Sequence, residues 1–215
     1  MRVAIIGATG LIGRSLLPLL SGHEVHALQR RAAPAGQTGV AVHVAEAGEW
    51  PRLVCGIAPD TAVSCLGTTM RQAGSHAAFR SVDRDMVLAF ARAARQAGAR
   101  RMLTVSSAGA SERAPNFYLA LKGEVERELA SLGFDRLDIF RPGLLRGPRG
   151  GDRRAGERIG ILLSPLTNLF LRGGLARYAA IDAQIVAEAM AAAIGASGSG
   201  VFVHEYSGIR RLAAR

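Results

Sequence analysis

The sequence predicts an α/β fold in which helices cover both faces of a doubly wound, mostly parallel sheet. Three observations point to it: short apolar runs alternate with helical patterns, each run is continuous, and no internal repeat occurs. Alternating strands and helices build parallel sheets through right-handed crossovers. Continuous apolar runs are typical of strands in such sheets, because helices cover both faces.

Seven apolar runs predict the strands of this sheet. They lie at residues 3–6, 25–28, 40–44, 62–66, 102–105, 137–140 and 201–206. Helical periodicity predicts helices at residues 11–20, 76–97, 117–132 and 181–194. Residues 144–180 are less regular, and residues 147–156 are rich in Gly and Arg, which predicts a loop on the substrate side of the fold.

Length and composition predict one domain over residues 1–215. A chain of 215 residues with 49% hydrophobic content can bury one sizeable core. No stretch approaches the roughly 18 uninterrupted apolar residues of a membrane span, and no secretory signal is recognisable. We therefore expect a cytoplasmic protein without a membrane span, in which Cys55 and Cys65 are reduced.

The formal net charge of +10 raises nucleic acid as a partner, but the distribution of the charge argues against it. Arginines are spread along the chain, and no block holds five or six like charges. We expect a solvated basic surface and no nucleic-acid partner. Of the 27 basic residues only Lys122 is a lysine, which suggests a position that needs a compact ammonium rather than a planar guanidinium.

Glycine recurs at Gly7, Gly10 and Gly13, directly after the first expected strand and at the start of the first helix. Glycine suits a tight turn, a close backbone approach to a pyrophosphate, and close helix–strand packing, while the helix N-terminus attracts anions. A glycine cluster by itself also occurs in ordinary tight turns. Its position inside a strand–helix–strand unit predicts dinucleotide binding.

The end of the second expected strand predicts NADP(H) rather than NAD(H). It reads Leu28-Gln29-Arg30-Arg31, and a carboxylate that could accept hydrogen bonds from the ribose hydroxyls of NAD is missing there. Arginine suits a 2′-phosphate instead. The alternative is that Arg30 and Arg31 are ordinary surface residues, because Arg doublets occur at four places in the chain.

Tyr118 and Lys122 stand at positions i and i+4 of an expected helix, so they lie on one face. An ammonium near a phenol favours proton exchange, since an ordinary phenol titrates near pH 10. The preceding strand ends in Ser106 and Ser107; we favour Ser107 to hold a substrate oxygen, with Ser106 as the alternative. An ordinary packed Tyr–Lys helix pair would show the same spacing.

Several short strings resemble the Tat-interacting-protein family of atypical short-chain dehydrogenases. They are CLGTTMR at residues 65–71, VDRD at 82–85, SSAGA at 106–110, NFY at 116–118, KGEVE at 122–126, FDR at 134–136 and RPG at 141–143. The similarity runs from residue 7 to about residue 157. It implies a Rossmann domain that binds NADPH, with a catalytic triad at Ser107, Tyr118 and Lys122.

The resemblance also implies a set of cofactor contacts. They fall on Gly7, Thr9, Gly10, Leu11, Ile12, Gly13, Arg30, Arg31, Cys65, Leu66, Gly67, Tyr118, Lys122, Pro142, Leu145 and Arg154. The last match needs a one-residue insertion, and the chain has alanine where the family has proline in its Arg-Pro-Gly-Glu string.

These residues predict an NADPH-dependent reductase of a small carbonyl substrate. Tyr118 would donate the proton, Ser107 would polarise the carbonyl, and Lys122 would hold the nicotinamide ribose. One alternative is an NADPH-sensing protein without turnover, and a third is a nucleotide-sugar epimerase or dehydratase. We expect no metal, since the histidines lack ligand spacing, and the leucines of residues 162–170 leave a homodimer open.

Overall fold

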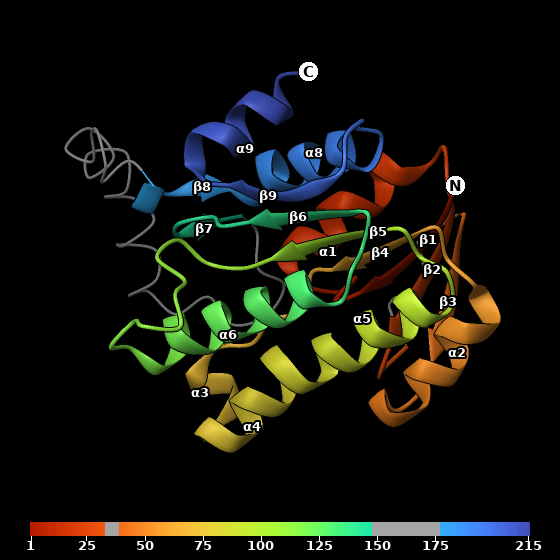
Figure 1. The fold of residues 1–215 in the computed structure, drawn as a ribbon, viewed down its shortest axis with the longest axis horizontal. Helices are drawn as coiled ribbons and strands as arrows, with labels where there is room; N and C mark the ends of the chain where they lie inside the picture. The colour runs from red at the N-terminus through yellow and green to blue at the C-terminus, as the bar shows by residue number, and fades with distance from the viewer. Residues whose placement is uncertain (33–38, 148–176) are drawn as a thin grey trace.

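The computed structural model describes residues 1–32, 39–147 and 177–215 (Figure 1). Within these residues, seven parallel strands form one sheet in the order β3-β2-β1-β4-β5-β6-β9. The strand order reverses between β1 and β4, which is where open α/β sheets bind their ligands. The strands are β1 (Arg2–Ile6), β2 (Glu24–Gln29), β3 (Val40–Val44), β4 (Thr61–Ser64), β5 (Arg101–Val105), β6 (Arg136–Phe140) and β9 (Gly200–His204).

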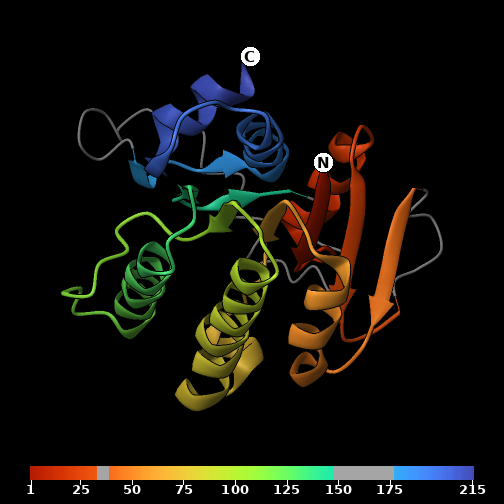
Figure 2. The same cartoon turned by 45° about the vertical axis from the view of Figure 1, so that its right-hand side comes forward.

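Helices pack on both faces of this sheet, as Figures 1 and 2 show, so the expected doubly wound fold is confirmed. The sheet separates two hydrophobic cores. Adjacent side chains of β1 point into different ones, since Ile5 packs with one helix layer and Ile6 with the other. The first layer contains α1 (Leu11–Leu16), η1 (Leu17–Leu20), α8 (Ala183–Ile194) and α9 (Tyr206–Ala213). The second contains α2 (Trp50–Ile57), α5 (Met86–Gln96) and α6 (Phe117–Ser131).

Shorter elements complete the described chain. They are η2 (Ala47–Glu49), α3 (Met70–Ala73), α4 (His76–Arg80), the π-turn η3 (Ser81–Asp85), and the small parallel pair β7 (Leu145–Arg146) and β8 (Ile181–Asp182). The helix expected over residues 76–97 is therefore interrupted by a π-turn. This turn contains Asp83, a residue of the site described below.

Several predicted boundaries are wrong because apolar patterns continue past the ends of the elements. The strand expected at residues 62–66 ends at Ser64, and the helix expected from residue 181 begins at Ala183. The last strand ends at His204, and Tyr206 already begins α9. The helices α2 and α9 were not predicted, since each has only 8 residues.

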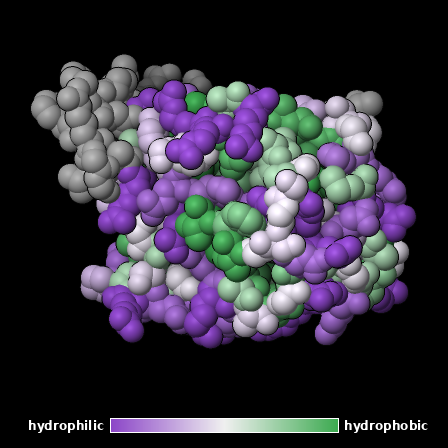
Figure 3. Space-filling view, turned by 45° about the horizontal axis from the view of Figure 1, so that its top comes forward, coloured by the Kyte–Doolittle hydropathy of each residue, from purple (hydrophilic) through white to green (hydrophobic). Residues whose placement is uncertain are grey.

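The two edge strands differ from the expectation that helices cover both faces of every strand. Val42 and Val44 on β3 and Val201 and Val203 on β9 are exposed. Hydrophobic residues also reach the surface in Figure 3, where they form patches among hydrophilic residues. Along the parts of the chain that the structure describes, we find no helix long and apolar enough to cross a membrane.

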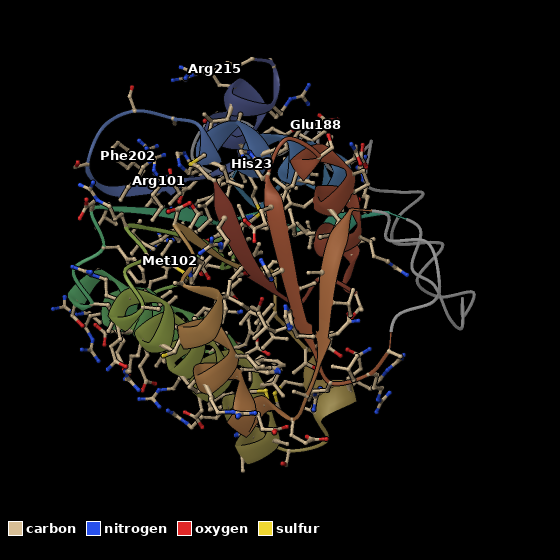
Figure 4. The ribbon with its side chains drawn as sticks, turned by 90° about the vertical axis from the view of Figure 1, so that its right-hand side faces the viewer. His23, Arg101, Met102, Glu188, Phe202 and Arg215 are labelled. Atoms are coloured by element: carbon tan, nitrogen blue, oxygen red, sulfur yellow. The ribbon has the colours of Figure 1, made fainter. Side chains whose placement is uncertain are left out.

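Arg101 fastens the α8 layer to the sheet. Its Nη1 donates hydrogen bonds to the carbonyl oxygens of Ile194 and Ala196, at 2.9 and 2.6 Å. The next residue, Met102, packs in the opposite core, so adjacent side chains of β5 serve the two layers (Figure 4). The α8 layer is thereby held to the sheet at the amino end of β5, the end opposite to the site.

A buried charge cluster joins β6 to the edge strand β9. Arg136 donates from Nε and Nη2 to the two carboxylate oxygens of Asp138, at 2.6 and 2.9 Å, and His204 Nε2 lies 2.8 Å from Asp138 Oδ1. Burial would raise the pKa of Asp138, but the hydrogen bonds from His204 and Arg136 outweigh it and lower that pKa. The Arg136 guanidinium also covers the ring of Phe202 at 4.0 Å.

Candidate nucleotide-binding and reaction site

The glycine loop between β1 and α1 requires residues without side chains at two positions. Gly7 has a φ of +77°, and a Cβ there would lie 2.4 Å from the backbone of Cys65 and Leu66. A Cβ on Gly13 would lie 2.3 Å from the carbonyl oxygen of Gly7. The N–H of Gly10 donates to that same oxygen at 3.0 Å, which closes the turn. The loop therefore holds the start of α1 tightly against β1.

The surface of this loop is backbone, as a phosphate-binding turn requires. Thr9 and Gly10 are exposed, Leu11 is half-buried, and Ile12 and Gly13 are buried. Gly10 caps α1 with extended backbone and without a side-chain hydrogen bond, so no side chain occupies the N–H groups of the first turn. These groups and the partial positive charge of the helix end suit an anionic group.

The segment after β4 lies directly against the glycine loop. The N–H of Cys65 donates to the carbonyl oxygen of Ile6 at 2.9 Å, which extends the pairing of β1 and β4. Burial raises the pKa of the Cys65 thiol to about 12, so the thiol is neutral at physiological pH. Gly67 is exposed, and Leu66 is half-buried. The predicted cofactor contacts at residues 65–67 therefore lie next to the glycine loop.

Asp83 connects the segment at residues 65–68 to Lys122. The carboxylate is 1% exposed; Oδ2 accepts the N–H of Thr68 at 2.8 Å, and Oδ1 lies 2.8 Å from Lys122 Nζ. Asp83 stands in the π-turn η3, a type of irregularity that often occurs at functional sites. Asp83 belongs to the VDRD string at residues 82–85, but the sequence predicted no role for it, because its partners are distant in the chain.

Tyr118 begins the helix that carries Lys122. Asn116 caps α6, with Oδ1 accepting the N–H groups of Tyr118 and Leu119 at 2.9 and 3.2 Å. The Tyr118 ring meets Phe79 edge-on, with centroids 5.7 Å apart. Asp83 offsets the charge of Lys122, so the electrostatic effect of Lys122 on Tyr118 is smaller than the sequence alone suggests.

The serine loop after β5 is fastened on two sides. The N–H of Ser106 donates to Phe140 O at 2.7 Å, and the N–H of Ala108 donates to Pro142 O at 2.9 Å. On the other side, a Cβ on Gly123 of α6 would lie 2.3 Å from the loop backbone. Ser107 is half-buried, whereas Ser106 is buried and its Oγ has no partner among the described residues. Both serines remain candidates.

The other predicted cofactor residues lie at the carboxyl edge of the sheet or outside the described residues. Arg30 and Arg31 are exposed just after β2, while the carboxamide of Gln29, 5% exposed, has no partner among the described residues. Leu145 lies on β7, close to α1. Arg154 falls outside the described residues.

Direct contacts therefore run from the glycine loop through residues 65–68 and Asp83 to Lys122. The sheet order, with a glycine loop at its switch point, defines an NAD(P)-binding protein of the Rossmann class. Residues 7–159 match the model of a family described as NAD(P)H-binding. The chain belongs to this NAD(P)H-binding family.

Curated relatives support this assignment. The chain is 38% identical over 173 residues to the mitochondrial protein FMP52 of Eremothecium gossypii, covering 77% of this chain and 76% of that protein. It is 36% identical over 161 residues to the mitochondrial FMP52 of Kluyveromyces lactis, covering 70% of each. The resemblance found in the sequence is thus confirmed for NAD(P)H binding, whereas these relatives carry the name FMP52 rather than that of Tat-interacting proteins.

The names of these relatives contradict the expected cytoplasmic location, because they are called mitochondrial proteins. That expectation rested only on the lack of a recognisable membrane span and secretory signal in the sequence, and it is wrong.

Solved structures with NAD share the fold. The UDP-glucose 4-epimerase of Thermus thermophilus in complex with NAD superposes with a TM-score of 0.72 at 19% identity, covering 100% of this chain and 81% of that one. MoeE5 in complex with UDP-glucuronic acid and NAD gives a TM-score of 0.72 at 18% identity, covering 95% and 75%. At these identities the likeness shows the fold alone.

Proposed function

We propose that this chain is an NADPH-dependent reductase of a small carbonyl compound. The observation that carries the proposal is the set of contacts from the glycine loop to Lys122 through Asp83, because it joins the nucleotide-binding edge to the helix that bears Tyr118. NADPH, when bound, supplies the hydride. The exposed backbone at Thr9 and Gly10 and the uncapped N–H groups of α1 fit the pyrophosphate of a dinucleotide.

In this proposal each residue of the triad has a separate task. The Tyr118 hydroxyl donates a proton to the carbonyl oxygen as it gains charge, and Ser107 donates a hydrogen bond to the same oxygen. Lys122 has three donors and forms an ion pair with Asp83, and its ammonium can also hold the ribose hydroxyls. Asp83 positions Lys122 and, through the N–H of Thr68, the segment at residues 65–68 beside the glycine loop.

Replacing Tyr118 tests the reductase. We expect Tyr118→Phe to lower turnover by about 100- to 10,000-fold while NADPH still binds, because it removes a proton donor. NADPH consumption is followed with a panel of aldehydes, ketones and quinones. Tyr206→Phe, which removes a phenol on α9 that bonds Arg210, is the matched control and should keep wild-type turnover.

The choice of NADPH over NADH rests on Arg30 and Arg31. Both are exposed beside the end of β2, where they can meet a 2′-phosphate. Fluorescence titration should show that Arg30→Ala/Arg31→Ala weakens NADPH binding by at least about 10-fold and leaves NADH binding unchanged. The doublet Arg210→Ala/Arg211→Ala on α9 controls for the loss of two charges. Equal affinity of the wild type for both cofactors would contradict this part of the proposal.

A second candidate, an NADPH sensor without turnover, is favoured by the Asp83–Lys122 pair. The carboxylate lies 2.8 Å from the ammonium and offsets its charge, which suits a lysine that binds the cofactor without turnover. A sensor should bind NADPH and change its protease sensitivity, yet consume none with any carbonyl compound. If the wild type gives that result, and Tyr118→Phe binds NADPH and changes its protease sensitivity in the same way, the reductase proposal is wrong.

A further inference from the structure

A pocket of about 420 Å³ lies beside α1, next to the glycine loop. Its lining includes Leu11, Arg14 and Ser15 from α1, Arg146 and Gly147 from the β7 segment, and Asp182 before α8. Two guanidinium groups thus face one carboxylate, and the net charge of these side chains is positive. No role for Arg14 or Arg146 follows from the reductase proposal.

Arg146 presents an unusual hydrogen-bonding edge to this pocket. Its Nε and Nη2 atoms are both buried, and neither has a partner among the described residues. These two nitrogens carry parallel N–H groups that fit two oxygens of one carboxylate or phosphate. A buried N–H without an acceptor is costly, and none of the described residues provides one, so this edge is suited to an acceptor from a bound group.

Two other arginines of the chain show what the same edge does when it is engaged. Arg136 uses Nε and Nη2 to hold both oxygens of Asp138, and Arg141 uses the same atoms to hold the two oxygens of Glu126. Asp182 lies opposite Arg146 in the pairing of β7 and β8. Among the described residues, however, neither Asp182 nor another carboxylate forms an ion pair with Arg146.

The backbone fixes Arg146 beside α1. Leu145 and Arg146 pair with Ile181 and Asp182, so the guanidinium projects from a short, hydrogen-bonded ladder. A Cβ on Gly147 would lie 2.9 Å from Leu11 Cδ1, so the chain at Gly147 approaches α1 closely. Arg146 is thereby held against the same helix turn that follows the glycine loop.

We propose that Arg146, assisted by Arg14, binds a phosphate group through its Nε–Nη2 edge. Two sources share this chemistry: the pyrophosphate of the dinucleotide, whose loop adjoins the pocket, and a phosphate-bearing molecule bound beside the dinucleotide. The site extends beyond the proposed reductase and does not depend on carbonyl turnover.

Calorimetric titration of the full chain with inorganic pyrophosphate at low ionic strength tests the site. The variants are Arg146→Gln, Arg14→Gln and the control Arg210→Gln, which removes an exposed arginine of α9. We expect Arg146→Gln to weaken binding by about 10-fold or more, and Arg14→Gln to weaken it by less, because only Arg146 loses a bidentate contact. Arg146→Lys, which keeps the charge but not the fork, should remain weakened.

A second titration distinguishes the two sources. If the phosphate belongs to the dinucleotide, pyrophosphate competes with NADPH, and Arg146→Gln weakens NADPH binding by a similar factor. If it belongs to another molecule, pyrophosphate binds to protein saturated with NADPH, and Arg146→Gln leaves NADPH affinity unchanged. The proposal is overturned if pyrophosphate does not bind, or binds folded wild type, Arg146→Gln and Arg210→Gln equally. Neither result depends on whether any carbonyl is reduced.

Discussion

Arg136 and Arg146 present the same guanidinium edge in two different surroundings. On β6, the Nε and Nη2 atoms of Arg136 hold Asp138, which His204 of β9 also contacts. On β7, the same two atoms of Arg146 are buried beside a pocket and have no partner among the described residues. The two positions lie at opposite sides of the Arg141–Gly143 turn, only a short stretch of chain apart.

The difference separates a structural charge from one suited to a ligand. A buried ion pair whose donors and acceptors are all engaged fixes the pairing of β6 with β9, and nothing further can bind there. A buried donor edge without an acceptor gains free energy from any oxyanion that reaches it. Satisfied hydrogen bonding, rather than burial or charge, is therefore the criterion that distinguishes these arginines.

Removing the carboxylate at Asp138 should give the largest effect. Asp138→Asn leaves the buried Arg136 without its counter-charge, which we expect to lower the free energy of unfolding by about 3–5 kcal/mol. Urea denaturation measures the loss. The double variant Arg136→Met/Asp138→Leu should recover most of it, because an apolar pair removes both charges. Equal instability of the single and double variants would contradict the assignment.

A methyl group at Gly147 should disturb the Arg146 region by a smaller amount. The φ of +154° and the approach to Leu11 both disfavour a side chain, although the Leu11 methyl can move. We expect Gly147→Ala to lower stability by about 1–2 kcal/mol and to weaken pyrophosphate binding. Gly56→Ala in α2, where a Cβ meets nothing within 4 Å, should instead stabilise the protein by about 0.5–1 kcal/mol.

The smallest expected effect is a pH dependence of stability that belongs to the Arg136 region. The pKa of Asp138 is lower in the folded chain than its ordinary value of 3.8. Its contribution to stability is therefore complete above that ordinary value and is lost as the pH falls through the folded pKa. As the pH falls from about 4 toward 2, the free energy of unfolding should decrease less steeply for Asp138→Asn than for the wild type.

The sequence predicted the fold well where local signals were strong. The glycine loop could be located because Gly7, Gly10 and Gly13 stand between a strand and a helix. The exposed faces of the edge strands could not be predicted, because an apolar run does not show whether a neighbour covers it. Neither could α2, whose helical spacing is confined to 8 residues.

Long-range contacts account for what the sequence left out of the site. The spacing of Tyr118 and Lys122 is local, so it could be identified directly. The carboxylate beside Lys122 comes from Asp83 on another element, and no spacing rule connects the two. The same applies to Arg146, because its role is inferred from the lack of a partner among the described residues and not from its residue type.

The π-turn at Ser81–Asp85 sets the helical phase between α4 and α5. Each residue of an α-helix turns the side-chain direction by about 100°, and a π-turn accommodates one extra residue within a continuous rod. Phe79 before the turn and Phe90 after it are both fully buried, with Asp83 between them directed at Lys122. Loss of a single residue from this turn would restore a regular helix with the two halves in the same phase and would change the position of Asp83 between them. Such a deletion would uncouple Asp83 from Lys122 without altering either residue.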